Sequence, residues 1–179
     1  MKKLLVILLI SLGLIGCTGN QIFVRNSPDP MPVVDYVDLD RFMGDWYVIA
    51  TIPTFLERDA YNPIETYQRD NDGSITTTFT FNKGSLNGPT KIYQPRGFVK
   101  DKRTNAIWGM QFVWPIKADY RIVYLDDNYQ QTIIGRISRD YVWIMARTPT
   151  ISQQDYSNLV DRVDSLGYDL DVLQKATHK

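Results

Sequence analysis

The stretch ITTTFTF at residues 75–81 decides the fold class, because apolar and polar side chains alternate along it. Ile75, Phe79 and Phe81 share one face, and three threonines occupy the other. A period of two residues is typical of a β-strand with one buried face. The preceding residues 70–73, DNDG, favour a tight hairpin turn. The stretch therefore predicts a strand that enters an antiparallel sheet through a hairpin.

Further strands with the same pattern extend in both directions and are joined by short, turn-rich links. They cover residues 46–52, 63–69, 90–100, 106–112, 120–124, 130–137 and 141–147. Eight strands in chain order predict an all-β fold, an eight-stranded antiparallel up-and-down β-barrel. Pro95 indicates an edge or a bulge within residues 90–100. Residues 168–173 are expected to add a short last strand.

One C-terminal helix is expected to follow the strands and to pack outside the barrel. Ser152 and Asp155 have the spacing of a capping box, and Gly167 ends a run of apolar residues at helical intervals. A single apolar stripe favours packing against the sheet. The same stripe could suit a membrane surface, but the polar face is acidic and lacks lysines.

The N-terminus resembles a bacterial lipoprotein signal. Two lysines precede an apolar run, and LIGC follows at residues 14–17, where Cys17 is the only cysteine of the chain. The run is shorter than the roughly 20 residues of a membrane span. The resemblance implies that residues 1–16 are a signal peptide and that Cys17 carries acyl chains such as palmitate. Thr18, in place of an aspartate, implies anchoring in the outer membrane, with the periplasmic face expected.

A free cysteine after an ordinary signal peptide is the other interpretation of Cys17. Residues 17–36 are rich in proline and are expected to form a lipidated tether, and residues 37–179 are expected to form the barrel domain. The chain has 20 basic and 20 acidic residues and no basic block, so no nucleic-acid partner is expected. His178 is the only histidine, which argues against a histidine-based catalytic or metal site. No cofactor and no metal are expected.

Three motifs of the barrel domain resemble those of the lipocalin family. Gly44 and Trp46 match its Gly-x-Trp motif at the start of the first strand. Asp126 and Tyr129 lie where the family has a Thr-Asp-Tyr turn, although the threonine is missing. Arg147 closes the last strand. In an up-and-down barrel all three lie at one end, so Arg147 can lie across the indole of Trp46 as a structural contact.

The opposite end is then expected to be the mouth of the barrel. Residues 54–62 could form a lid there or a loop with a hydrophobic plug, and a ligand head group is expected near tyrosine hydroxyls or Lys117. An eight-stranded barrel has an interior that side chains fill or that holds one small ligand, and the pattern leaves both open. The expected ligand-binding residues are Trp143, Tyr141, Met145, Phe79, Phe81, Trp108, Met110, Phe112, Tyr120, Ile122 and Tyr124.

The resemblance is strongest to bacterial outer-membrane lipocalins, relatives of apolipoprotein D. It implies a membrane-anchored protein, not an enzyme, that binds and stores or transports a fatty acid or a lysophospholipid. The resemblance is also compatible with a homodimer. A structural envelope lipoprotein with a filled barrel and a lipocalin-fold enzyme are the two alternatives.

Overall fold

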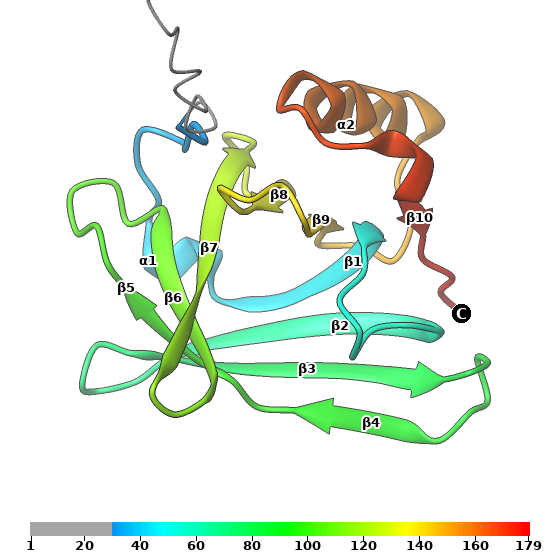
Figure 1. Cartoon of the computed structure of the whole chain (residues 1–179), viewed down its shortest axis with the longest axis horizontal. Helices are drawn as coiled ribbons and strands as arrows, with labels where there is room; N and C mark the ends of the chain where they lie inside the picture. Colours follow the sequence, from blue (N-terminus) through cyan, green and yellow to red (C-terminus); the bar gives the residue numbers. More distant parts are fainter. Residues whose placement is uncertain (1–29) are drawn as a thin grey trace, which may run out of the picture.

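Within residues 30–179, which the computed structural model describes, the strands join into a single antiparallel sheet (Figure 1). Their order is β10-β1-β2-β3-β5-β6-β7-β8-β9, with β4 beside β3, and β1 also pairs with β9. That last pairing closes the sheet into the predicted eight-stranded barrel, which is confirmed. The strands are β1 (Gly44–Ile52), β2 (Ala60–Arg69), β3 (Ile75–Lys83), β4 (Thr90–Tyr93), β5 (Arg96–Val99), β6 (Ile107–Val113), β7 (Ile116–Leu125), β8 (Gln131–Gly135), β9 (Val142–Ala146) and β10 (Gln174–Lys175).

The strand expected at residues 90–100 is divided at Pro95. β4 pairs with the end of β3, whereas β5 pairs with the start of β3 and with β6. Proline has no backbone N–H for the ladder, so the regular pairing with β3 is interrupted between Tyr93 and Arg96. β4 and β5 together therefore occupy one of the eight positions around the barrel.

The strand expected at residues 168–173 is absent. A 3-10 helix, η1 (Leu170–Val172), takes its place, and the side chain of Asp169 accepts a hydrogen bond from the Asp171 N–H at 3.0 Å. This local cap competes with an extended backbone. The strand pairing begins later, where β10 adds to β1 at Ala50 and Thr51.

The predicted helix is confirmed as α2 (Gln153–Ser165), which packs on the outside of the barrel (Figure 1). Ser152 Oγ accepts a hydrogen bond from the Asp155 N–H at 3.0 Å. Gly167, at φ +82°, ends the helix in the left-handed conformation that glycine adopts without strain. Leu159 and Val163 are buried against apolar side chains on the outer face of the sheet.

The packed part of the chain begins before residue 37, where the barrel domain was expected to start. Met31 is buried in the cluster under α2, and the Val34 N–H donates to the Ile122 carbonyl at 3.1 Å. The end of the expected tether therefore lies on the barrel wall. Cys17 and the signal sequence lie outside the described residues.

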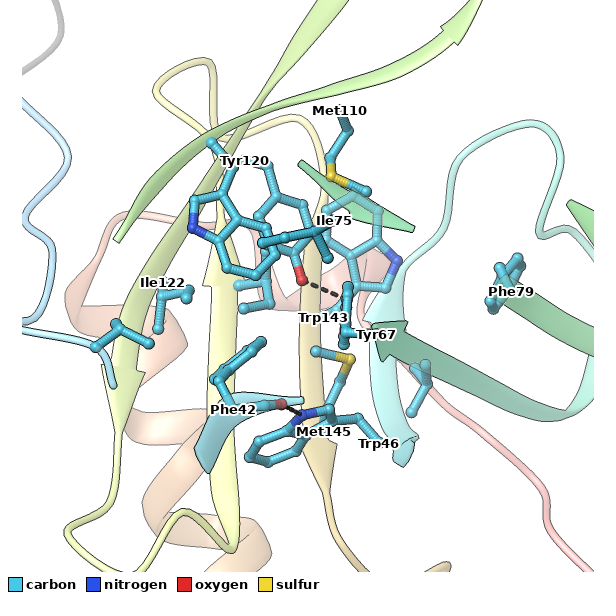
Figure 2. Packing of buried hydrophobic residues seen from close by; sticks show 14 of the residues in the cluster. Phe42, Trp46, Tyr67, Ile75, Phe79, Met110, Tyr120, Ile122, Trp143 and Met145 are labelled. Carbon is cyan, nitrogen blue, oxygen red and sulfur yellow. Dashed lines mark hydrogen bonds between the residues drawn. The ribbon is translucent and has the colours of Figure 1, made fainter. Parts of the chain in front are cut away.

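Large side chains fill the closed end of the barrel (Figure 2). Phe42, from the short helix α1 (Leu39–Phe42), lies with its ring centroid 5.0 Å from that of Trp46 and 5.6 Å from that of Trp108. Tyr67 completes the layer at 5.6 Å from Phe42. Trp46, Trp108 and Phe42 have no exposed surface. This layer forms a solid floor across the barrel.

Arg147 holds this floor together. Its guanidinium carbon lies 3.9 Å from the centroid of the Trp46 ring. Its Nη2 donates to the carbonyls of Arg41, Phe42 and Met43 at 2.8–3.1 Å, and its Nη1 donates to that of Asp45 at 2.7 Å. The side chain therefore joins the end of β9 to the turn before β1, in the arrangement expected from the sequence.

Replacement of Arg147 by alanine should destabilise the barrel without changing the upper part of its interior. The variant loses the cation–π contact and leaves four backbone carbonyls, two of them partly buried, without their guanidinium donor. We expect the free energy of unfolding, measured by urea titration, to fall by about 1–3 kcal/mol. Arg147→Lys should recover only part of the loss, because one ammonium cannot reproduce the planar donor geometry.

Arg103→Ala is the matched control, since its side chain is 89% exposed. It should leave stability within about 0.5 kcal/mol of the unmodified protein. An Arg147→Ala variant as stable as this control would show that the stack does not support the fold.

Candidate ligand-binding site

A cavity of about 520 Å³ opens above the aromatic floor. Its size lies within the range of about 300–1,000 Å³ that is usual for small-molecule sites. Most of its wall is apolar, and it reaches from the middle of the barrel to the β1–β2 loop (residues 53–59) and the β6–β7 hairpin. The lining residues are Thr54, Phe55, Leu56, Glu57, Glu65, Thr77, Phe79, Tyr93, Pro95, Met110, Phe112, Val113, Ile116, Ala118, Asp119, Tyr120, Arg136, Tyr141 and Trp143.

Several of the residues expected to bind a ligand line this cavity. They are Phe79, Met110, Phe112, Tyr120, Tyr141 and Trp143. Each belongs to a strand or lies next to the end of one, and the alternation in the sequence predicts that its side chain points into the barrel. Figure 2 shows Met110, Tyr120 and Trp143 near one another above the floor. Their contact with a ligand stays a prediction.

Four other expected residues are buried but do not line the cavity. Trp108, Ile122 and Met145 lie with no exposed surface in the filled part of the interior, where the rings of the floor leave no space. Phe81 lies behind Tyr93, with ring centroids 6.1 Å apart. The expectation that these four form the cavity wall is corrected: they support the wall from below or behind.

The expectation for Tyr124 is also corrected, because its side chain lies outside the barrel. The guanidinium carbon of Arg162, on α2, lies 4.3 Å from the centroid of its ring. The register of β7 against β8 shifts between Ile122 and Tyr124. One extra residue in a ladder reverses the facing of the residues beyond it, and Tyr124 follows that shift.

Glu57 joins the β1–β2 loop to the barrel wall, which the sequence did not reveal. Its side chain is 9% exposed and accepts hydrogen bonds from Trp143 Nε1 and from the Thr54 N–H, both at 2.7 Å. Burial raises the pKa of Glu57, while the hydrogen bonds from Thr54 and Trp143 act in the opposite direction. The loop thus places a carboxyl in the cavity and is fixed there by it.

A second carboxyl, that of Glu65, lies within the barrel on β2. The Tyr67 hydroxyl donates to Glu65 Oε2, and the hydroxyls of Tyr67 and Tyr120 are hydrogen-bonded to each other. Burial raises the pKa of Glu65 to about 7; the hydrogen bond from Tyr67 lowers it, and the charge of Glu57 adds to the rise. The alternation that turns Tyr67 inward also turns Glu65 inward, and this was the signal available in the sequence.

A cationic group lies at the mouth, but it is Arg136 and not Lys117. Arg136 lines the cavity, its Nη1 lies 3.1 Å from Asp140 Oδ2, and its Nε is buried without a hydrogen-bond partner among residues 30–179. The Nζ of Lys117 instead lies 3.5 Å from the ring centroid of Phe98, and Lys117 does not line the cavity. The expected position of Lys117 is therefore corrected.

The rim of the mouth carries exposed apolar side chains. Phe55 on the β1–β2 loop is 72% exposed, and Trp114 on the β6–β7 hairpin is 82% exposed. Val113 and Ile116 beside it are also exposed. Exposed apolar side chains that gather at one opening often mark a site that meets an apolar partner or ligand.

Two further features of residues 30–179 bear on other kinds of site. No group of three or more histidine, cysteine, aspartate or glutamate side chains there is placed to hold a metal ion. No helix in the same part of the chain is both long and apolar enough to cross a membrane.

Comparisons with known proteins agree with this geometry. The Lipocalin-like domain family matches residues 37–178. Temperature-induced lipocalin-1 of Arabidopsis thaliana is 30% identical over 154 residues, which are 81% of either chain. Outer membrane lipoprotein Blc of Escherichia coli K12 is 29% identical and covers 81% of this chain and 83% of its own length. Apolipoprotein D of Bos taurus is 27% identical over 86% of this chain and 83% of its own.

Solved structures show the same fold at lower identity. Insecticyanin from the tobacco hornworm Manduca sexta superposes with a TM-score of 0.66 at 18% identity, over 85% of this chain and 86% of its own. The barrel, the floor motifs and the family match over nearly the whole described chain lead to one conclusion. This chain belongs to the lipocalin family.

Proposed function

We propose that the protein binds a single-chain lipid, a fatty acid or a lysophospholipid, in the cavity above the floor and stores or transports it without catalysis. The observation that carries this proposal is the cavity of about 520 Å³ with a mainly apolar wall. Burial of acyl surface there would contribute about 25 cal/mol per Å², which offsets the loss of ligand freedom. The filled floor limits how far a chain can enter.

A fatty acid or lysophospholipid would place its anionic head at the mouth. Arg136 supports this orientation, because it is the cationic residue among those that line the cavity. The two buried carboxyls lie on the wall as well, and they would repel an anionic head that entered first. The acyl chain would lie along Phe79, Met110 and Trp143.

Anchoring in the outer membrane through Cys17 forms part of the proposal. It rests on the lipoprotein-like sequence that ends at Cys17 and on the relatives named outer membrane lipoprotein Blc. The exposed apolar rim would suit a protein that takes its ligand from a lipid phase. A homodimer and the periplasmic face are proposed on the resemblance alone.

A filled structural barrel is the alternative, and the floor is the observation that favours it. A titration of tryptophan fluorescence with a fatty acid separates the two functions, since Trp143 lines the cavity and Trp46 does not. Saturable quenching supports a carrier. No response to fatty acid or lysophospholipid would leave the filled barrel as the function.

Replacement of Trp143 by aspartate should abolish lipid binding or unfold the barrel. The change puts a carboxylate beside Glu57, which Trp143 now contacts, and removes much of the apolar wall. We expect the affinity for a fatty acid, measured by calorimetry on the chain from Thr18 onward, to fall at least about tenfold, which is 1.4 kcal/mol.

Two further variants keep this test decisive. Ala118→Trp reduces the cavity volume without a new charge, so it should weaken binding even if Trp143→Asp does not fold. Ile92→Asp is the control, because Ile92 is 60% exposed and lies outside the cavity lining. Unchanged affinity in a folded Trp143→Asp and in Ala118→Trp would place the ligand elsewhere.

The membrane anchor depends on one thiol. Cys17→Ser should leave the precursor uncleaved or mislocalised and should remove the protein from the membrane fraction, as followed by fractionation and gel mobility. Thr18→Asp is the matched variant: it keeps the thiol and should move the protein to the inner membrane. Normal processing and membrane retention of Cys17→Ser would contradict the anchor.

A further inference from the structure

Three polar side chains, those of Glu57, Glu65 and Thr77, line the same cavity. Glu65 on β2 pairs with Phe79 on β3, and Tyr67 pairs with Thr77. Glu65 and Thr77 are therefore diagonal neighbours on the inward face. Glu57 reaches the same cavity from the β1–β2 loop, and its charge acts on Glu65. They interrupt an otherwise mainly apolar wall.

The hydroxyl of Thr77 has no partner. Thr77 is 1% exposed, its Oγ1 is buried, and no described residue forms a hydrogen bond with it. Buried hydroxyl groups are almost always hydrogen-bonded, because their burial without a partner is costly. Since Thr77 lines the cavity, rotation of its side chain about the Cα–Cβ bond would bring this hydroxyl to a bound ligand, which could then complete it.

Glu65 also has a carboxyl oxygen that can accept a further hydrogen bond. Its Oε2 accepts from Tyr67, but its Oε1 has no hydrogen bond from any residue in the described part of the chain. The Tyr67 hydroxyl is also hydrogen-bonded to the Tyr120 hydroxyl. A carboxylate oxygen can accept more than one hydrogen bond, so Oε1 is free for a donor in the cavity.

No cationic side chain among residues 30–179 forms an ion pair with either carboxyl. The contacts of Glu57 are an indole N–H and Thr54, and those of Glu65 are a tyrosine hydroxyl. Arg136, the cationic residue of the cavity lining, is paired with Asp140. Burial without a counter-charge favours the neutral form of both carboxyls, and a cation that enters the cavity would stabilise their ionised form.

We propose that Glu65, Thr77 and Glu57 form a polar subsite that binds the ammonium group of a single-chain amphiphilic amine, with the chain directed toward the mouth. An ammonium has three donors and no acceptor, and the subsite offers three acceptor groups. The chain then lies along the apolar upper wall and the rim. This assignment rests on the proposed lipid-binding function and names a ligand class for the same cavity.

Three ligands with the same chain length but different head groups test which head group the subsite binds. They are dodecylamine, dodecan-1-ol and dodecanoate. Binding is measured by competition on the full chain in nonionic detergent. Affinities are compared as ratios between variant and unmodified protein, in which partition into micelles cancels. Glu65→Gln should lower dodecylamine affinity at least tenfold and leave dodecanoate affinity unchanged or higher, because the amide keeps an acceptor for Tyr67 but carries no charge.

Two more variants sharpen this comparison. Thr77→Val has nearly the same shape and removes the unpartnered hydroxyl, so it should raise the melting temperature of the free protein while it weakens dodecylamine binding several-fold. Asp59→Asn is the control on the same loop, because its carboxylate pairs with Lys83 and its side chain is 74% exposed. It should change none of the three affinities.

Dodecylamine binding should also strengthen as pH rises from about 6 to 8, because Glu65, whose pKa is raised to about 7, becomes ionised over this range. The pKa of Glu57 is also raised, and the Tyr67 and Tyr120 hydroxyls stay protonated because burial raises their pKa values further. Asp119, Arg136, Tyr93 and Tyr141 are the other titratable groups of the cavity. The pH dependence should become weaker in Glu65→Gln, where only Glu57 can still ionise, and should be absent for dodecan-1-ol.

The outcomes distinguish this inference from the proposed function. Dodecylamine affinity within twofold of the unmodified protein in Glu65→Gln overturns the subsite while lipid binding stands. An equal loss for dodecan-1-ol overturns the ammonium assignment in favour of a neutral donor. If none of the three ligands binds the unmodified protein, the lipid-binding function fails and the subsite fails with it.

Discussion

The stack of Arg147 on Trp46 is the contact on which the rest of the structure depends. The guanidinium comes from the end of β9 and the indole from β1, so one side chain joins the last and first strands where the barrel closes. Its donors are taken by backbone carbonyls of the turn before β1. Because these donors are used within the protein, this end of the barrel supports stability and leaves ligand chemistry to the opposite end.

The filled floor also determines where polar groups can act. Phe42, Trp46 and Trp108 close the lower half, and Tyr67 and Tyr120 lie at the upper limit of this layer. Their hydroxyls form a chain that ends at the Glu65 carboxyl. The aromatic layer therefore has two roles: its rings pack the core, and its hydroxyls fix a carboxyl at the base of the cavity. The position of that carboxyl follows from core packing.

Local periodicity was enough to predict the barrel and the helix, and strand alternation placed Phe79, Met110 and Tyr120 on the inward face. Parity failed at Tyr124, where a bulge reverses the facing and no side chain marks the extra residue. Glu57 and Glu65 escaped prediction for a different reason. Charged residues in loops and strands are mostly exposed, and their burial arises only after the barrel closes around them.

Glu57 connects loop position to ligand chemistry. The same carboxyl that lies in the cavity holds the β1–β2 loop to Trp143 on β9. The ionised carboxylate accepts hydrogen bonds more strongly than the neutral acid does, and burial disfavours that ionised form. A cationic group beside Glu57 would restore it and tighten the loop contact, whereas an uncharged chain would not. If the subsite binds an ammonium group, the strength of the loop contact and the charge of the bound head group would therefore be coupled through Glu57.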